Sequence, residues 1–229
     1  MRRFYSDVAV VGDAGGFGIA LDSKPVRTPA RAAFVVPCRA LAEAIADEWA
    51  AQGEAIVPTT MPMTAMANAA IDLAAPAMTG FAAPLIAFGE SDLLCYRAPD
   101  ADLAAEQARA WNPILGWAEG RYGVAFTLAT GIIHVAQPPA TLAALGKAVL
   151  ALDAPRLAAL HPLVTIGGSL VVALAAVERA FDADALWDAV TLDEVWQEQR
   201  WGAVDDAVEA REAKQAEWMA AARLLALLG

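Results

Sequence analysis

Short apolar, β-branched runs separated by turn residues fill the first forty positions of the chain. Residues 5–11 and 17–21 are strand-like, and a glycine-rich stretch at 12–16 lies between them. This pattern predicts a β-hairpin. Shorter runs at 26–28 and 33–36 are each followed by a proline, which is typical of short strands at the edge of a sheet. A sheet this small needs a covering layer to be stable.

A helix that can supply this cover follows immediately. Within residues 38–52, Leu41, Ile45 and Trp49 recur every four positions, which is the spacing of a helix with one apolar face. We expect this helix to lie on the sheet and to complete an N-terminal domain that ends near Pro58.

Beyond Pro58 the apolar spacing is helical over most of the chain. The predicted fold class is α+β: a small antiparallel β-rich N-terminal domain (residues 1–58) followed by a larger, mainly helical C-terminal domain (residues 59–229). Two segments, 93–97 and 124–135, have strand character, and the second is predicted to form a hairpin added to the sheet. Helices are expected at 64–73, 77–88, 101–121, 140–151, 155–180, 184–201 and 203–228.

The stretch between Arg156 and Glu178 contains no charged residue and is about long enough to cross a bilayer. A His-Pro pair and a Gly-Gly pair interrupt it, however, and its continuous apolar run covers only residues 170–177. We therefore expect a buried core helix here, and no membrane insertion.

Composition narrows the classes of partner. The 229 residues are 58% apolar and carry a net charge of −11, so the chain can bury a substantial core. Binding to nucleic acid or to an anionic membrane needs a basic surface, and the charge argues against both. Cys38 and Cys95 lie in apolar settings and are interpreted as core thiols of a protein in a reducing compartment.

The negative charge is concentrated towards the C-terminus. Residues 178–217 contain twelve acidic and four basic residues, a net of −8, and four tryptophans, at 187, 196, 201 and 218, lie in or beside this segment. Two interpretations stay open: a solvated helical bundle sealed by large side chains, or an acidic, aromatic surface that binds a basic partner.

Helical spacing places five of these residues on one stripe: Trp187, Val190, Glu194, Glu198 and Trp201. A carboxylate between tryptophans on a partly apolar face is costly unless it is paired. The partner is either an internal arginine (Arg97, Arg121 or Arg179) or a basic group on another protein.

No catalytic, metal or cofactor motif is recognisable. The glycine-rich residues 12–18 lack the spacing and the lysine of a phosphate-binding loop. His134 and His161 are the only histidines and stand in no metal-ligand spacing. We expect no catalytic residue, no metal site and no cofactor. The less favoured alternative is a small-molecule enzyme with its site between the two domains, lined by His134 or His161.

The order and spacing of several motifs over about 200 residues resemble those of the chaperone family that assists the alpha subunit of F-type ATP synthase. In the first half these motifs are Arg3-Phe4-Tyr5, Leu21-Asp22-x-Lys24-Pro25-Val26-x-Thr28-Pro29, Glu48-Trp49-x-x-Gln52, Met61-Pro62-Met63-Thr64 and Asp92-Leu93-Leu94-Cys95-Tyr96-Arg97. In the second half they are Gln107-x-x-x-Trp111-x-Pro113, Thr130-Gly131-Ile132, Gly168-Ser169-Leu170 and Glu194-x-x-Gln197-x-x-x-Trp201-Gly202.

The resemblance implies an ATP-independent chaperone that binds the unassembled alpha subunit and prevents its aggregation until it pairs with beta. It also implies a β-containing N-terminal domain and a helical C-terminal domain. The partner-binding residues are expected to be Trp187, Glu194, Gln197, Glu198 and Trp201, and which of the two glutamates matters more stays open. An acidic helical adaptor for another basic protein is the alternative function.

The setting of the protein is also expected from the resemblance. Family members occur in mitochondria and in alphaproteobacteria, and no transit peptide precedes Arg3-Phe4-Tyr5. We therefore expect a bacterial cytoplasmic protein, corresponding to the mitochondrial matrix in eukaryotic relatives. We expect it to be monomeric when free.

Overall fold

The N-terminal strands form the predicted antiparallel sheet in the computed structural model, which describes residues 1–13, 15–202 and 204–229. Strand β1 (Val8–Asp13) pairs with β2 (Gly16–Leu21) as a hairpin. Two short strands, β3 (Lys24–Pro25) and β4 (Val35–Val36), also pair with β2. The predicted hairpin turn includes Ala14, which lies outside the described residues.

Gly16 is required where β2 begins. Its φ is +152°, and a Cβ atom there would lie 2.3 Å from the backbone oxygen of Val36. Because no other residue type lacks a Cβ, only glycine lets β4 approach β2 this closely.

Helix α1 (Arg39–Ala50) covers the sheet with the predicted apolar face. Leu41 and Ile45 on this face are fully buried. Trp49 is half-buried and packs edge-on against Tyr5, whose hydroxyl donates a hydrogen bond of 2.7 Å to the Trp49 carbonyl oxygen. The short helix η1 (Pro58–Thr60) follows.

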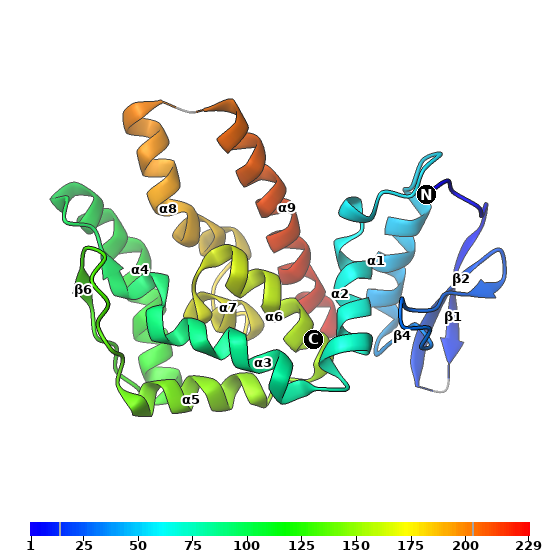
Figure 1. The fold of residues 1–229 in the computed structure, drawn as a ribbon, viewed down its shortest axis with the longest axis horizontal. Coiled ribbons are helices and arrows are strands. Elements are labelled where there is room, and N and C mark those ends of the chain that lie inside the picture. Colours follow the sequence, from blue (N-terminus) through cyan, green and yellow to red (C-terminus); the bar gives the residue numbers. More distant parts are fainter. Residues whose placement is uncertain (14, 203) are drawn as a thin grey trace.

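The remaining helices build the body of the molecule (Figure 1). Helix α7 lies buried at the centre of this body, where it contacts α4, α6, α8 and α9. Together with the sheet, these helices confirm the predicted α+β fold class. The helices are α2 (Pro62–Ala69), η2 (Ala70–Ala74), α3 (Met78–Ala87), η3 (Phe88–Ser91), η4 (Leu93–Cys95), α4 (Ala101–Tyr122), α5 (Pro139–Leu150), α6 (Ala154–Gly167), α7 (Leu170–Val177), α8 (Ala183–Trp201) and α9 (Asp205–Leu228).

The single helix predicted at 155–180 is wrong, because the structure has two helices there. Gly168 adopts a left-handed φ of +67° and ends α6, which is a common helix stop. Ser169 then caps α7 by accepting a hydrogen bond from Val172 N through its hydroxyl. The segment is buried, as predicted. Among the described residues no single helix is long and apolar enough to span a membrane, although Pro62–Ala74 and Met78–Cys95 pass that test together as a pair bent by 114°.

The hairpin predicted at 124–135 is also wrong. Only β6 (Ala129–Thr130) is a strand, and it pairs in parallel with β5 (Tyr96–Arg97), away from the N-terminal sheet. The side-chain amide of Gln137 both accepts from Thr127 N and donates to Thr127 O. It therefore takes the hydrogen bonds that a second strand of a hairpin would have made.

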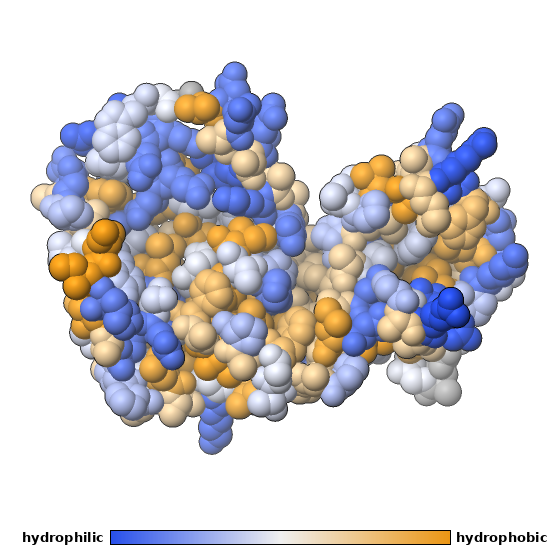
Figure 2. Space-filling model, viewed as in Figure 1, coloured by the Kyte–Doolittle hydropathy of each residue, from blue (hydrophilic) through white to orange (hydrophobic). Residues whose placement is uncertain are grey.

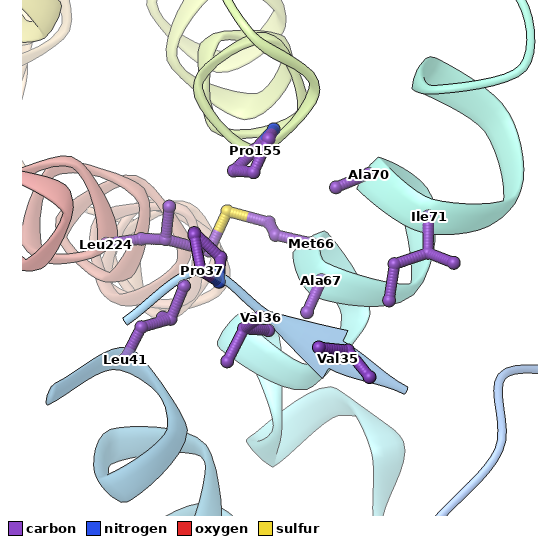
Figure 3. A pocket seen from close by; sticks show the side chains of 10 residues that line it. All are labelled: Val35, Val36, Pro37, Leu41, Met66, Ala67, Ala70, Ile71, Pro155 and Leu224. Atoms are coloured by element: carbon purple, nitrogen blue, oxygen red, sulfur yellow. The ribbon is translucent and has the colours of Figure 1, made fainter. Parts of the chain in front are cut away.

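The sheet, α1 and the helical body meet around α2. A small apolar cavity of about 30 Å³ marks this junction (Figure 3). Its walls combine Val36 of β4, Leu41 of α1 and Met66 of α2 with Pro155 of α6 and Leu224 of α9. The apolar core is continuous from the N-terminal part into the helical part, and the domain boundary at residue 58 stays a prediction.

Candidate functional site

Helices α8 and α9 form a long hairpin whose lower half belongs to the core. Trp187 of α8 is 4% exposed and Trp218 of α9 is fully buried, with their ring centroids 5.9 Å apart. On the other side of α8, the indole N–H of Trp111 donates a hydrogen bond of 2.7 Å to the carbonyl oxygen of Ala189. Trp187, expected to contact a partner, is thus enclosed by the protein's own helices. The structure separates it from the other four predicted site residues.

The upper half of the hairpin projects from the body (Figure 1). Trp201, at the last turn of α8, is 70% exposed. Its ring packs edge-on against Trp196, with centroids 5.7 Å apart, and the Arg200 guanidinium lies over the Trp196 ring. Glu194 and Gln197 are exposed on the same part of α8. The described residues here form a surface that we call the α8 tip: Glu194, Trp196, Gln197, Glu198 and Trp201.

Glu198 is paired inside the protein, but not with any of the arginines suggested by the sequence. Its partner is Arg211, which reaches across from α9, and both side chains are about one-fifth exposed. Arg97 instead donates to the Asn112 side chain, and Arg121 pairs with Glu178. Helical spacing within α8 cannot show a residue on the facing helix, which is why Arg211 was missed.

Glu194 differs from Glu198 in this respect. Within the described ranges Glu194 has no salt bridge to another side chain, and it is exposed. The α8 tip therefore presents an unpaired carboxylate, an amide and an exposed tryptophan ring. A free carboxylate and an exposed aromatic ring on one helix end suit basic side chains, which can form an ion pair with the first and lie against the second.

A second surface, not predicted from the sequence, lies between the α8–α9 hairpin and the N-terminal part. It is an open apolar groove of about 980 Å³, and Figure 2 shows the molecule hollowed at this place. Helix α9 forms one wall, α2 and η1 form the opposite wall, and α6 forms the floor. Leu73, which is 58% exposed, and Phe81 supply the largest apolar side chains of the lining.

The two histidines do not form the pocket that the enzyme alternative requires. His161 lines the groove and packs near the Phe81 ring, but Glu217 is the only carboxylate among the described residues of the lining. His134 lies elsewhere, 3.2 Å from the Tyr96 hydroxyl. Among the residues that the structure describes, no group of three or more His, Cys, Asp or Glu side chains is placed to hold a metal ion.

The architecture and the sequence both match known chaperones. A sequence model of the family described as "ATP12 chaperone protein" matches residues 2–119, just over half of the chain. The chain belongs to the ATP12 chaperone family. This confirms the family resemblance found from the sequence motifs.

Solved structures and a curated relative cover nearly all of this ATP12-family chain. The crystal structure of Atp12 from Paracoccus denitrificans is 37% identical, with a TM-score of 0.91 over 99% of this chain and 97% of that one. A putative chaperone from Agrobacterium tumefaciens is 39% identical, with a TM-score of 0.93 over 100% of this chain and 86% of that one. Mitochondrial atp12 of Schizosaccharomyces pombe is 25% identical over 221 residues, or 91% of this chain and 76% of the relative.

Several motifs that carried the ATP12 resemblance turn out to position the two surfaces. The Glu48 carboxylate accepts hydrogen bonds from the backbone N–H groups of Met63 and Thr64 and from the Thr64 hydroxyl, and so fixes the start of α2. Burial of this carboxyl raises its pKa. The Gln52 side chain accepts from Val57 N and donates to the Thr60 hydroxyl. Both residues of the Glu48-Trp49-x-x-Gln52 motif therefore hold the wall of the groove.

Gln107 and Asp92 position the helices below the α8 tip. Gln107 accepts from Ala98 N and donates to the Asp193 carboxylate of α8 at 2.8 Å. Asp92 is fully buried and accepts hydrogen bonds from the Ser169 hydroxyl, Val171 N and Leu94 N. These contacts join η4 and α4 to the helices α7 and α8, so the tip stands on a rigid base.

Proposed function

We propose that the protein is an ATP-independent chaperone that binds the unassembled alpha subunit of F-type ATP synthase and prevents its aggregation until it pairs with beta. The observation that carries this proposal is membership of the ATP12 chaperone family, supported by 37% identity to Paracoccus Atp12 over nearly the whole chain. The exposed, aromatic α8 tip supports a role in binding a partner.

Binding by mass action is the simplest mechanism for such a chaperone. An alpha subunit without its beta neighbour exposes an apolar interface that favours aggregation. A protein that binds this surface lowers the concentration of free, aggregation-prone client in proportion to its affinity. Beta then displaces the chaperone because it binds alpha more tightly, and no nucleotide is required for release.

We assign the first contact with the client to the α8 tip, at Glu194, Gln197 and Trp201. Trp201 is exposed and large, which is typical of a residue that contributes much of the binding energy at an interface. Glu194 is the glutamate that remains free to pair with a basic residue of the client. Glu198 already pairs with Arg211, and we therefore give it the supporting role of keeping α8 against α9.

The proposed setting follows the bacterial relatives. We propose that the protein acts in the bacterial cytoplasm and is monomeric when free, so that the tip is open to the client. Light scattering coupled to gel filtration tests whether the free protein is monomeric. A mass near 23.9 kDa is expected, and a mass of twice that value would contradict it.

Co-expression with tagged alpha or tagged beta subunit tests the proposal. The chain should be retained by alpha and released when beta is added in excess. Capture by beta and never by alpha would contradict the proposal. A salt series distinguishes the chaperone from the alternative of an acidic adaptor. A purely electrostatic adaptor loses its partner steeply as ionic strength rises, whereas a complex with buried apolar contacts retains most of its affinity.

A further inference from the structure

We propose that the groove between α2 and α9 is a second client-binding site, which takes an apolar segment of the client chain flanked by Lys or Arg. This inference rests on the proposed chaperone function and adds a place and a chemistry to it. The lining is mostly apolar, and its volume of about 980 Å³ is at the upper end of the range for sites that hold compact organic ligands. It can therefore receive several side chains of a peptide segment.

The exposed apolar residues of the groove are costly for the free protein. Leu73 is 58% exposed, and Pro58 and Ala65 of the same lining are also exposed. Soluble proteins seldom expose a contiguous apolar surface unless something binds to it. The walls are held in place before binding, since Glu48 and Gln52 fix η1 and the start of α2. A preformed groove loses little conformational entropy when a segment enters.

The charged residues of α9 determine which kind of client segment can bind. Glu217 of α9 lines the groove, and the exposed acidic residues Glu209 and Asp206 lie outside the lining, two to three turns nearer the start of the same helix. They reach about 16 Å from Glu217 along the helix axis. Among the described lining residues Lys214 balances Glu217, whereas beyond the groove Arg211 is already paired with Glu198 and leaves Glu209 and Asp206 exposed. A basic residue that flanks the apolar segment on this side therefore meets negative charge at the start of α9.

The groove and the α8 tip are both built on helix α9. Helix α9 supplies the groove wall through its middle turns and, one turn earlier, supplies Arg211 to Glu198 of the tip. A single client can therefore contact both surfaces at once, and each contact raises the effective concentration of the client at the other.

A labelled peptide tests the groove independently of the alpha subunit. The probe is a twelve-residue peptide of leucine and alanine with a lysine at each end, and binding is followed by fluorescence anisotropy. Leu73→Asp should weaken binding about tenfold or more, because it places a charge in the apolar wall. Leu150→Asp is the matched control, since Leu150 is similarly exposed, at 49%, outside the groove. The affinity of the Leu150→Asp variant for the peptide should equal that of the wild type.

The charge requirement is tested with the same probe. Glu217→Lys should weaken binding about threefold or more, whereas Glu119→Lys, the same reversal at an exposed residue of α4, should not. A peptide with glutamate at both ends should bind less tightly than the lysine peptide. Failure of the lysine peptide to bind, or equal binding by Leu73→Asp and wild type, would overturn the groove assignment.

Photo-cross-linking to the client then connects the groove with the proposed function. A photoreactive phenylalanine analogue at Ala213, which lines the groove, should cross-link to purified alpha subunit, and the same group at the exposed Ala143 of α5 should not. Cross-links at both positions, or at neither while alpha still co-purifies with the protein, would contradict the groove and leave the chaperone function standing. Absence of any complex with alpha would instead contradict the proposed function, whatever the peptide result.

Discussion

Tryptophans stand at both ends of the α8–α9 hairpin, but their environments are opposite. In the lower half Trp187 is 4% exposed and Trp218 is fully buried, and the two rings pack against each other. In the upper half Trp196 and Trp201 pack edge-on against each other, and Trp201 is 70% exposed. The lower pair holds the fold together, and the upper pair is available to a partner.

The difference shows that residue type and helical position do not decide burial in this hairpin. Trp187 and Trp201 fall on the same stripe of one helix. What separates them is the presence of α6 and α7 beneath the lower half, whereas the upper half extends past these helices and faces the start of α4 only across an open cavity. An acidic, aromatic helix end thus stays exposed where the apolar core stops.

The largest effect is expected from the lower pair. Trp218→Ala should lower the free energy of unfolding by about 3–5 kcal/mol, because it leaves a large cavity beside Trp187 in the core. Urea denaturation followed by circular dichroism measures it. Trp218→Phe is the matched variant and should lose less, since it retains most of the apolar contact. A Trp218→Ala variant as stable as the wild type would show that the lower half is not core.

Asp92, which caps the buried helix α7 beneath this half, is expected to have the next largest effect. Asp92→Asn should lower the free energy of unfolding by about 1–3 kcal/mol, because an amide N–H₂ group replaces one of the two accepting oxygens. One of these oxygens accepts from Val171 N, and the other accepts from the Ser169 hydroxyl and Leu94 N. Thermal and urea unfolding measure the loss. Asp92→Ala, which removes all of these acceptors, should be no more stable than Asp92→Asn.

The stability cost of Asp92→Asn should also depend on pH. Burial raises the pKa of the Asp92 carboxyl from its ordinary value of 3.8 to about 6, against hydrogen bonds that lower it. The folded protein therefore binds this proton more tightly than the unfolded chain, so the stabilisation is lost as pH rises through about 6. The cost of Asp92→Asn should be larger at pH 5 than at pH 7.5. A cost that rises with pH would contradict the assignment.

A smaller effect is expected from the ion pair that joins the two arms of the upper half. Arg211→Ala should lower the free energy of unfolding by about 1 kcal/mol or less, because both side chains are partly exposed. Hydrogen exchange should be faster at the last turns of α8 and the first turns of α9 and unchanged in α7. A double-mutant cycle with Glu198→Ala measures the coupling free energy between the two side chains. A coupling of zero would show that the ion pair does not stabilise the tip.

The smallest effect on stability is expected at the tip itself. Trp201→Ala should change the free energy of unfolding by less than about 0.5 kcal/mol, because the side chain is mostly exposed. The same denaturation experiment that detects Trp218→Ala checks it. A loss comparable to that of Trp218→Ala would mean that the two halves of the hairpin do not differ.

Local patterns predicted much of this fold. The hairpin, the apolar face of α1 and the extent of α8 follow from alternation, from the spacing of Leu41 and Ile45, and from helical spacing up to Trp201. The same spacing could not show that Trp187 is covered, because burial depends on α6 and α7, which are distant in sequence. The Gly-Gly pair at 167–168 was recognised as an interruption, but one helix was still predicted over 155–180 because the segments on both sides are apolar.

The candidate site was predicted only in part for the same reason. The stripe on α8 identified Glu194, Glu198 and Trp201, yet Arg211 lies on a different helix and reaches Glu198 only because α8 and α9 fold back on each other. The groove was not predicted as a client-binding surface, since its lining comes from η1, α2, η2, α3, α6 and α9. No single segment carries a signal for a surface assembled from elements so far apart in the sequence.

Suppression of alpha-subunit aggregation by a charge-reversed tip tests the central claim most directly. Light scattering of diluted, denatured alpha subunit is followed with wild-type protein, with Glu194→Lys, and with Glu119→Lys as the matched reversal on exposed α4. We predict that Glu194→Lys needs about tenfold more protein for half-maximal suppression, a loss of about 1.4 kcal/mol of binding free energy, at an unchanged melting temperature. Equal suppression by all three proteins would contradict the assignment of the client contact to the α8 tip.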